Sequence, residues 1–140
     1  MDKPSINGNT IVIPSSTRFL TAVDDFVEGF LREYGTSDSV VADIAISVSE
    51  LVNNAITHGN KISEDAIVSV SVTRTGDMVT IAVTDEGGGF NPQEIDDPLK
   101  EENLMKEVGR GIFIVESLMD KVEITPTDNG TTVSISKKIA

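Results

Sequence analysis

The hydrophobic pattern of this chain changes period near its middle, and this change limits the folds open to it. Before residue 60, apolar residues recur three and four positions apart, which is typical of helices buried on one face. Over residues 68–83 and 121–136, apolar and small polar residues alternate instead, which is typical of half-buried hairpins. A sheet with one wet face needs helices on its dry face. We therefore expect an α+β fold, a two-layer α/β sandwich with a mixed, mostly antiparallel sheet and roughly three helices on one face.

Capping residues delimit the helices. A strand at residues 10–14 precedes a first helix that residues 15–16 cap and Gly35 ends. The second helix opens at residues 37–38 and stops near residues 58–60. The apolar stripe of the first helix comprises Phe19, Val23, Phe26, Val27, Phe30, Leu31 and Tyr34.

The charge balance excludes one large class of partners. With 23 acidic and 11 basic residues the formal net charge is -12 at pH 7, whereas nucleic-acid phosphates need clustered Lys and Arg. Cys is absent, which excludes disulfides and thiolate metal sites. No apolar stretch is expected to cross a bilayer, and Met1 to Pro4 lead into no signal peptide. We expect one cytoplasmic domain over residues 1–140 that binds neither nucleic acid nor membrane.

The second helix carries two polar residues among its apolar ones. Glu50 and Asn54 are four positions apart, so they lie one turn apart on the same side of the helix. A carboxylate and a carboxamide on one stripe can serve as a base and as a hard-metal ligand at once. The alternative is a solvated polar stripe beside a core face. This segment alone leaves both interpretations open.

A glycine run follows the second strand of the first hairpin. Asp85 comes at the strand end, and residues 87–89 are all glycine. A carboxylate there can accept a hydrogen bond from an amine, such as the exocyclic amine of adenine, and glycines let the backbone approach a flat ring. Asp and Gly are also ordinary turn residues, so this run alone does not identify a site.

Residues 87–111 break the pattern, because glycines, prolines and a run of acidic residues exclude a packed element. Such a segment is typically a functional lid or an unstructured surface loop, and its glycine-rich ends favour a lid. Gly109, Arg110 and Gly111 are predicted to open a third helix, where bare N–H groups favour phosphate oxygens and Arg110 adds a cation. The alternative is a loop-to-helix junction that needs a flexible backbone. The chain has neither the dinucleotide-binding fingerprint nor the phosphate-loop motif.

Taken together, these three elements resemble the N, G1 and G2 boxes of the GHKL ATPase superfamily, in the same order. The matching residues are Glu50, Asn54, Ala55 and His58, then Asp85, Gly87 and Gly89, then Gly109 and Gly111. The likeness covers nearly the whole chain, and it is strongest to the small bacterial anti-sigma-factor serine/threonine-protein kinases of the sporulation and general-stress type. It implies the histidine-kinase-like (Bergerat) ATP-binding fold over residues 1–140, with a lid near residues 90–108.

The resemblance also implies roles for matching residues. Asn54 would coordinate the Mg²⁺ that bridges the ATP phosphates, and Glu50 would act as the catalytic base or orient the magnesium shell. Asp85 would hold the adenine amine. The other residues expected at the ATP or ADP site are Gly87, Gly89, Gly109, Arg110, Gly111, Thr131 and Thr132. His58 is expected to be structural, neither catalytic nor a zinc ligand.

By the same resemblance, the chain would phosphorylate a small anti-sigma-factor antagonist of the STAS type, sequester a sigma factor and form a homodimer. The first helix departs from the pattern, because many relatives carry a partner-contacting Arg where this chain has Asp24 and Asp25. Two alternatives stay open. One is a nucleotide-gated module that traps a partner without phosphorylating it, which Glu50 disfavours. The other is the catalytic half of a histidine kinase, for which a preceding helical hairpin with an acceptor His is missing.

Overall fold

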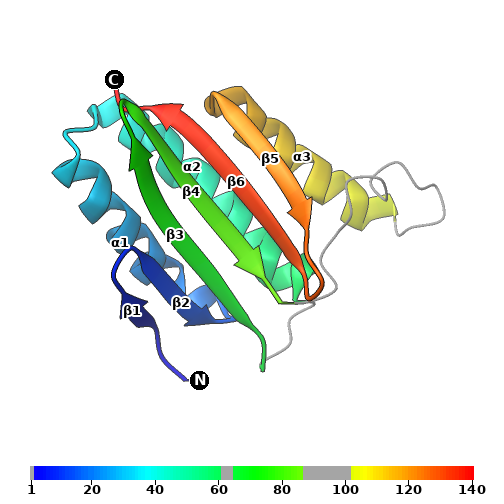
Figure 1. Cartoon of the computed structure of the whole chain (residues 1–140). Coiled ribbons are helices and arrows are strands. Elements are labelled where there is room, and N and C mark those ends of the chain that lie inside the picture. Colours follow the sequence, from blue (N-terminus) through cyan, green and yellow to red (C-terminus); the bar gives the residue numbers. More distant parts are fainter. Residues whose placement is uncertain (1, 61–64, 87–101) are drawn as a thin grey trace.

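The computed structural model describes residues 2–60, 65–86 and 102–140, with side chains in the last range from residue 110. Over these residues, six strands form one sheet in the order β1-β2-β3-β4-β6-β5 (Figure 1), and every pairing is antiparallel. The strands are β1 (Ser5–Asn7), β2 (Thr10–Pro14), β3 (Ile67–Thr75), β4 (Met78–Asp85), β5 (Lys121–Pro126) and β6 (Thr131–Lys138). The helices are α1 (Leu20–Glu33), α2 (Asp38–Asn54) and α3 (Glu102–Leu118), with a 3₁₀ turn η1 (Thr17–Phe19) and a π-helical turn η2 (Ala55–Gly59).

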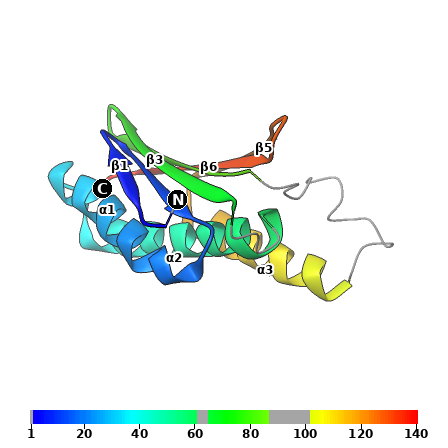
Figure 2. The same ribbon diagram turned by 90° about the horizontal axis from the view of Figure 1, so that it is seen from below.

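The three helices lie on one face of the sheet, which makes two layers (Figure 2). Residues alternate between buried and half-buried along residues 67–72 of β3, all of β4 and most of β6, as the sequence alternation predicts. A contiguous core lies between the layers, and its fully buried side chains include Ile13, Leu31, Ile44, Ile56, Ile81 and Ile135. The α+β two-layer sandwich expected from the sequence is confirmed, with a sheet that is antiparallel in all its described pairings.

The first helix forms as its stripe and cap predict. Ser16 caps η1, because its hydroxyl accepts a hydrogen bond from the Arg18 N–H at 3.4 Å. Along α1, Val23, Val27 and Leu31 are buried in the core, and the partly buried Phe19, Phe26, Phe30 and Tyr34 pack at its edge. Every member of the predicted stripe therefore contacts or enters the core.

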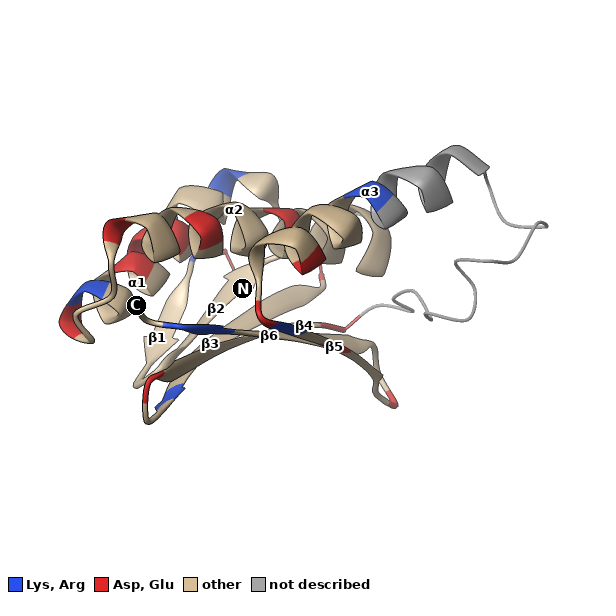
Figure 3. Cartoon of the chain, turned by 90° about the horizontal axis from the view of Figure 1, so that it is seen from above, with Lys and Arg blue, Asp and Glu red and all other residues tan. Residues whose placement is uncertain are grey.

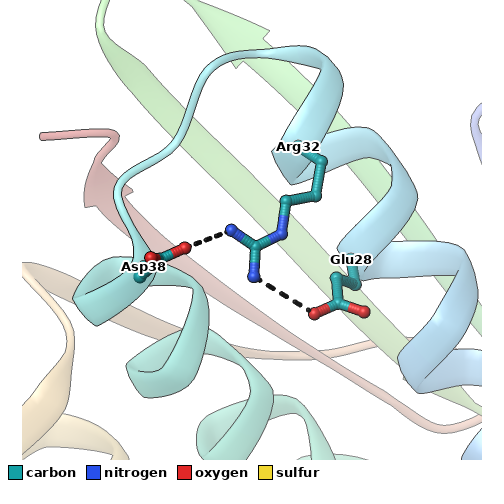
Figure 4. Close-up of polar contacts among 3 residues, drawn as sticks. All are labelled: Glu28, Arg32 and Asp38. Atoms are coloured by element: carbon teal, nitrogen blue, oxygen red, sulfur yellow. Dashed lines mark hydrogen bonds and ion pairs between the residues drawn. The ribbon is translucent and has the colours of Figure 1, made fainter.

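The turn between α1 and α2 is held by one glycine and one arginine. Gly35 has φ +74°, a left-handed conformation that glycine adopts without strain. Arg32 pairs with Glu28 on its own helix at 3.5 Å and with Asp38 at the start of α2 (Figure 4). All three side chains are at least half exposed, so these pairs define the geometry of the turn more than they stabilise the fold.

The central helix is unusually long and apolar. The run from Asp38 to Gly59 spans 22 residues and contains an 18-residue window with a mean hydropathy of 1.3, which by length and composition is enough to cross a membrane. The prediction that no stretch has this property is therefore wrong. In the fold this run is the core helix, and 56% of its apolar window is buried. Its last turn widens into η2, where the Asn60 N–H bonds the Ala55 carbonyl at 2.7 Å. Such π-helical turns are frequent at functional sites.

Two elements differ from the sequence prediction. α3 begins at Glu102 rather than at residues 109–111, so Gly109 and Gly111 lie inside the helix. Residues 102–108 include good helix formers, and an interior glycine costs only about 1 kcal/mol, so the helix continues through it. β1 is not evident from the sequence, because three residues are too few to show an alternation. Gly8, at φ +60°, turns β1 into β2.

Charge is distributed unevenly between the layers. Acidic residues recur along the helical layer, whereas the strands are largely uncharged (Figure 3). On the half-buried side of β4 and β6, small hydroxyl groups pair across the strands. Thr80 bonds Ser136 at 2.8 Å and Thr84 bonds Thr132 at 2.9 Å.

Candidate functional site

Glu50 and Asn54 of α2 lie together against Gly111 of α3. A Cβ added at Gly111 would stand 3.0 Å from Glu50 Oε2 and 3.1 Å from Asn54 Nδ2. Glu50 is half-buried, and Asn54 is only 4% exposed. The interpretation of these two residues as a solvated stripe is therefore wrong for Asn54. The structure thus brings Gly111 next to Glu50 and Asn54, although Gly111 follows Glu50 by 61 positions in the sequence.

Asn54 carries an unsatisfied polar group. Its Nδ2 is buried and has no hydrogen-bond partner among the described residues. A buried amide left unpaired costs about 1–3 kcal/mol, so folded proteins rarely keep one without a reason. Because a carboxamide has an oxygen at one end and an NH₂ at the other, a half-turn presents either to a ligand at this point.

The chemistry of this pair fits a hard cation that brings other ligands with it. Within the described residues, no three His, Asp or Glu side chains cluster as a self-sufficient metal site. Glu50 and Asn54 offer two oxygen donors on adjacent turns of one helix. Mg²⁺ is typically held in this way, by one or two side chains together with phosphate oxygens and water.

Asp85 ends β4 beside η2, the continuation of the helix that carries Asn54. It is 5% exposed, and its Oδ1 accepts a hydrogen bond from the Thr131 N–H at 3.3 Å. Two glycines approach it closely. A Cβ at Gly59 would stand 2.6 Å from Asp85 Cγ, and one at Gly130 would stand 2.8 Å from Asp85 Oδ1. Neither position has room for a side chain, so the backbone at Gly59 and Gly130 packs directly against Asp85. We refer to these two glycines around the Asp85 carboxylate as the cradle.

Asn60 links three chain segments next to this cradle. Its Nδ2 donates to Ser15 Oγ and to the Ile67 carbonyl, each at 3.0 Å, and its Oδ1 accepts from the Glu86 N–H at 2.9 Å. Glu86 in turn accepts the Ile67 N–H at 3.0 Å. Asn60 is 3% exposed. The roles of Gly59, Asn60 and Gly130 are not predicted from the sequence, although the first two follow His58 directly.

The structure separates the two threonines predicted for the adenine site. Thr131 is opposite Asp85 in the β4–β6 pairing and is buried on the same face of the sheet. Thr132 is opposite Thr84 and points to the other face, because successive strand residues alternate. Only Thr131 is therefore brought to Asp85. His58 is half-buried in η2, and in the sequence it lies between Asn54 and Gly59.

The remaining predicted residues divide between α3 and the part of the chain that is not described. Gly109 and Arg110 lie in α3, and Arg110 is exposed. Because α3 begins at residue 102, the N–H groups of Gly109 and Gly111 are interior helical donors rather than free N-terminal ones. The helix-N-terminus interpretation is therefore corrected. Gly87 and Gly89 lie outside the described residues, as does the predicted lid up to residue 101, while residues 102–108 belong to α3.

A cavity of about 700 Å³ lies near the same end of α2. It is lined by Asp2, Pro14, Ser15, Ser16, Thr17, Arg18, Phe19, Ile56, Thr57 and Asp65. Among the described residues of the predicted site, none lines this cavity. Ser15 connects the two regions, because it both lines the cavity and bonds Asn60.

Known proteins resemble this chain over nearly its full length. A profile described as the histidine kinase-like ATPase domain matches residues 13–137. Serine-protein kinase RsbW of Staphylococcus aureus (strain JH9) is 28% identical over 134 residues, which are 91% of this chain and 84% of that protein.

Among solved structures, the RsbU and RsbW domains of Rv1364c from Mycobacterium tuberculosis superpose with a TM-score of 0.63 at 22% identity. The match covers 93% of this chain but 32% of that one, so this chain spans about a third of its length. The mycobacterial sensor histidine kinase MprB superposes with a TM-score of 0.57 at 18% identity, covering 91% of this chain and 95% of that one. At these identities the structural matches support the fold alone.

Proposed function

The chain belongs to the histidine kinase-like ATPase domain family, and we propose that it is an ATP- and Mg²⁺-dependent protein serine/threonine kinase that acts as an anti-sigma factor. The observation that carries the proposal is the grouping of Glu50 and Asn54 against Gly111, with the buried Asn54 amide unsatisfied. Family membership implies nucleotide binding. The 28% identity to a staphylococcal serine-protein kinase supports protein phosphorylation as the use of that nucleotide.

Asp85 is proposed to recognise adenine. Its carboxylate is an acceptor without a proton to donate, which suits the exocyclic amine of adenine and repels the carbonyl that guanine carries at that position. The backbone cradle of Gly59 and Gly130 limits the positions open to this carboxylate. Thr131 adjoins it on the same face of the sheet, which supports a place for Thr131 in the base pocket.

The phosphate side of the proposed site rests on α2 and α3. Asn54 would hold Mg²⁺, and Glu50 beside it could orient the magnesium shell; the ion would supply charge neutralisation and fix the orientation of the phosphates. Gly111 leaves the space in front of both side chains open, since a Cβ there would touch each of them. Arg110 directly precedes Gly111 on α3 and is exposed, and its guanidinium is proposed to contact a phosphate oxygen.

Glu50 is proposed as the catalytic residue. Phosphoryl transfer needs little covalent chemistry from the protein, so orientation of the attacking hydroxyl and removal of its proton are the tasks that remain. Glu50 is half-buried beside Asn54, so it can act on a hydroxyl delivered by a partner without leaving its place on α2.

The partners follow from the family likeness. We propose that the hydroxyl belongs to a Ser or Thr of a small STAS-type anti-sigma-factor antagonist, that the chain sequesters a sigma factor, and that it forms a homodimer in the cytoplasm. We also propose that residues 1–140 are a single ATP-binding domain whose lid lies near residues 90–108.

Phosphoryl transfer is tested with partners co-purified from the native host, with and without ATP, and identified by mass spectrometry. Incubation with γ-labelled ATP is expected to label a Ser or Thr of a small partner. Glu50→Gln is expected to lower this labelling by roughly two orders of magnitude, the usual contribution of a positioned base, while ATP affinity changes little. A wild-type chain that binds ATP and its partner but never labels it would instead be a nucleotide-gated trap.

Adenine recognition is tested separately, without a partner. Calorimetric titration with Mg²⁺ is expected to show tighter binding of ATP than of GTP, because a lost buried hydrogen bond costs roughly 1–3 kcal/mol. Asp85→Ala is expected to remove most of this difference. Equal affinities for ATP and GTP in the wild type would contradict the role given to Asp85.

A further inference from the structure

We propose that Gly59 and Asn60 are positioning residues that hold the Asp85 carboxylate in place and thereby set the preference of the site for a 6-amino purine. This inference rests on the proposed binding of adenine nucleotide at Asp85. It assigns a task to two residues that make no proposed contact with nucleotide and act through a third residue.

Gly59 controls where the carboxylate can lie. A Cβ at this position would stand 2.6 Å from Asp85 Cγ and closer still to Oδ2, so any side chain there displaces the carboxyl group. Cγ and Oδ2 lie at the end of a side chain that can rotate, whereas Asp85 Cβ, at 3.1 Å, need give by only a few tenths of an ångström. At Gly130 the corresponding Cβ would meet the main-chain carbonyl oxygen of Asp85 most closely, as well as Oδ1 at 2.8 Å. Gly59 therefore affects the position of the carboxylate more selectively than Gly130 does.

Asn60 holds the backbone next to Asp85 in place. It accepts the N–H of Glu86, the residue after Asp85, and it donates to Ser15 after β2 and to Ile67 at the start of β3. Ile67 also donates its own N–H to the Glu86 side chain. The buried Asn60 carboxamide thus connects the end of β4 to the start of β3 and to the end of β2. The Glu86 side chain makes a second connection between β4 and β3.

The carboxamide of Asn60 is already occupied. Nδ2 donates to two oxygens and has no donor left for a nucleotide, Oδ1 already accepts one N–H, and the residue is only 3% exposed. Its effect on binding must pass through the loop that carries Asp85.

The sharper test is Gly59→Ala, with Gly29→Ala as its matched control. Both glycines are helical, but a Cβ at Gly29 on α1 would meet nothing within 4 Å. Binding of ADP and of IDP, which carries a carbonyl in place of the 6-amino group, is measured by calorimetry with Mg²⁺. Gly59→Ala is expected to weaken ADP binding by roughly tenfold or more and to leave IDP binding unchanged or improved. Gly29→Ala should alter neither affinity.

The second test is Asn60→Ala, with Asn9→Ala as its control. Asn9 also donates from its Nδ2 to a β3 carbonyl, that of Val72, at 3.0 Å, but toward the opposite end of that strand. Asn60→Ala is expected to reduce the ratio of ADP to IDP affinity by roughly tenfold, and Asn9→Ala should leave the ratio unchanged. A general loss of stability would lower both affinities together and would leave their ratio intact.

A double-mutant cycle decides whether the two residues act through Asp85. In an Asp85→Ala background, Gly59→Ala and Asn60→Ala are each expected to change ADP affinity by less than about twofold, because the group that they position is gone. Full additivity with Asp85→Ala, or a preserved ADP-to-IDP ratio in both single variants, would overturn the inference. A wild-type chain that binds no ADP would instead overturn the proposed function itself.

Discussion

Asn54 is a residue at which burial and hydrogen bonding disagree. It is 4% exposed, yet its amide nitrogen has no partner among the described residues. Ser47, two turns earlier on α2, is fully buried and its hydroxyl is also unpartnered within the described part of the chain. The two residues differ in surroundings, because the Asn54 side chain adjoins the position of Gly111 and Glu50, whereas Ser47 lies two turns before Asn54 along the helix. Burial alone therefore does not identify a site, whereas burial beside a second functional group does.

Asn54→Ala is expected to abolish Mg²⁺-dependent nucleotide binding and phosphoryl transfer without unfolding the protein. Removing an unpaired buried amide relieves a cost of about 1–3 kcal/mol, which offsets the packing that the side chain provides. The melting temperature should therefore change by only a few degrees. Thermal denaturation and calorimetric titration of ADP with and without Mg²⁺ provide the measurements.

Ser47→Ala is the control for this change. It removes an equally buried polar atom, likewise unpartnered among the described residues, from the same helix, so its stability effect should be similar. Its Mg²⁺-dependent ADP affinity should equal that of the wild type. A cooperative transition lowered by many degrees in Asn54→Ala alone would make Asn54 a structural residue and would contradict the role proposed for it.

At the scale of elements, the sequence predicts well where the pattern is long and local. The stripe of α1 and the alternation of β3, β4 and β6 each repeat several times, so few other arrangements satisfy them. The start of α3 is predicted wrongly, because glycine is read as a helix breaker although its cost is small beside that of ending a packed helix. β1 is missed, because its three exposed residues bury nothing.

The candidate site is predictable to a similar extent. Glu50, Asn54 and Asp85 are identified by residue type and order, and the structure places each in a buried or half-buried position. The cradle around Asp85 is not predictable, because Gly130 reaches Asp85 through the β4–β6 register, whereas Gly59 and Asn60 reach it through the packing of η2 against β4. A lone glycine or asparagine in a turn has too many ordinary explanations to be selected from sequence.

Gly111→Ala is expected to impair the site while the α3 helix stays intact. Alanine favours the helix by about 1 kcal/mol over glycine. Its methyl group would stand 3.0 Å from Glu50 Oε2 and 3.1 Å from Asn54 Nδ2, so both side chains must shift. The Mg²⁺-dependent affinity for ADP should fall by roughly tenfold, in line with the cost of inserting a methyl group into a filled site. Helicity and melting temperature, followed by circular dichroism, should be unchanged or higher.

Ser117→Ala on the exposed face of the same helix is the control for helix propensity. It should raise or preserve stability and leave ADP affinity unaltered. If Gly111→Ala binds ADP as tightly as the wild type, then the contact between α2 and α3 at this point has no part in nucleotide binding.

The acidic face of α1 gives a prediction about pH. Partial desolvation, followed by the neighbouring carboxylates of Glu28 and Asp25, raises the pKa of Asp24 above its ordinary value of 3.8. The folded state therefore binds this proton more tightly than the unfolded chain does. Ionised Asp24 destabilises the fold at neutral pH, and this penalty disappears as the pH falls through the raised pKa to below 3.8.

Asp24→Asn should accordingly raise the melting temperature at pH 7, and its advantage over the wild type should shrink as the pH approaches 3.8. Thermal denaturation across this range is the measurement. Asp25→Asn, which removes the same charge from the neighbouring exposed position, should give a smaller gain at pH 7. An advantage of Asp24→Asn that grows on acidification would contradict the sign of this linkage.

For the whole molecule, the excess of acidic residues is the dominant electrostatic feature. The net charge is -12, and acidic residues recur along the helical layer, whereas the strands carry few charged residues (Figure 3). The described ion pairs Arg32–Asp38 and Lys121–Glu123 are half or more exposed, so they offset little of this repulsion. Lys137–Asp43, at 3.6 Å, is better covered and links β6 to α2.

Because like charges are this numerous, sodium chloride is expected to stabilise the fold. Raising the ionic strength from about 0.01 M to 0.15 M shortens the screening length from about 30 Å to about 8 Å, which weakens repulsion across the helical layer more than it weakens the few close pairs. The melting temperature should rise with salt and level off once the screening length is shorter than the spacing between helices. Lys137→Met, which removes the covered pair, should lower the melting temperature at every salt concentration but leave the upward slope in place. A melting temperature that falls with added chloride would show that ion pairs, rather than net repulsion, dominate the electrostatics of this fold.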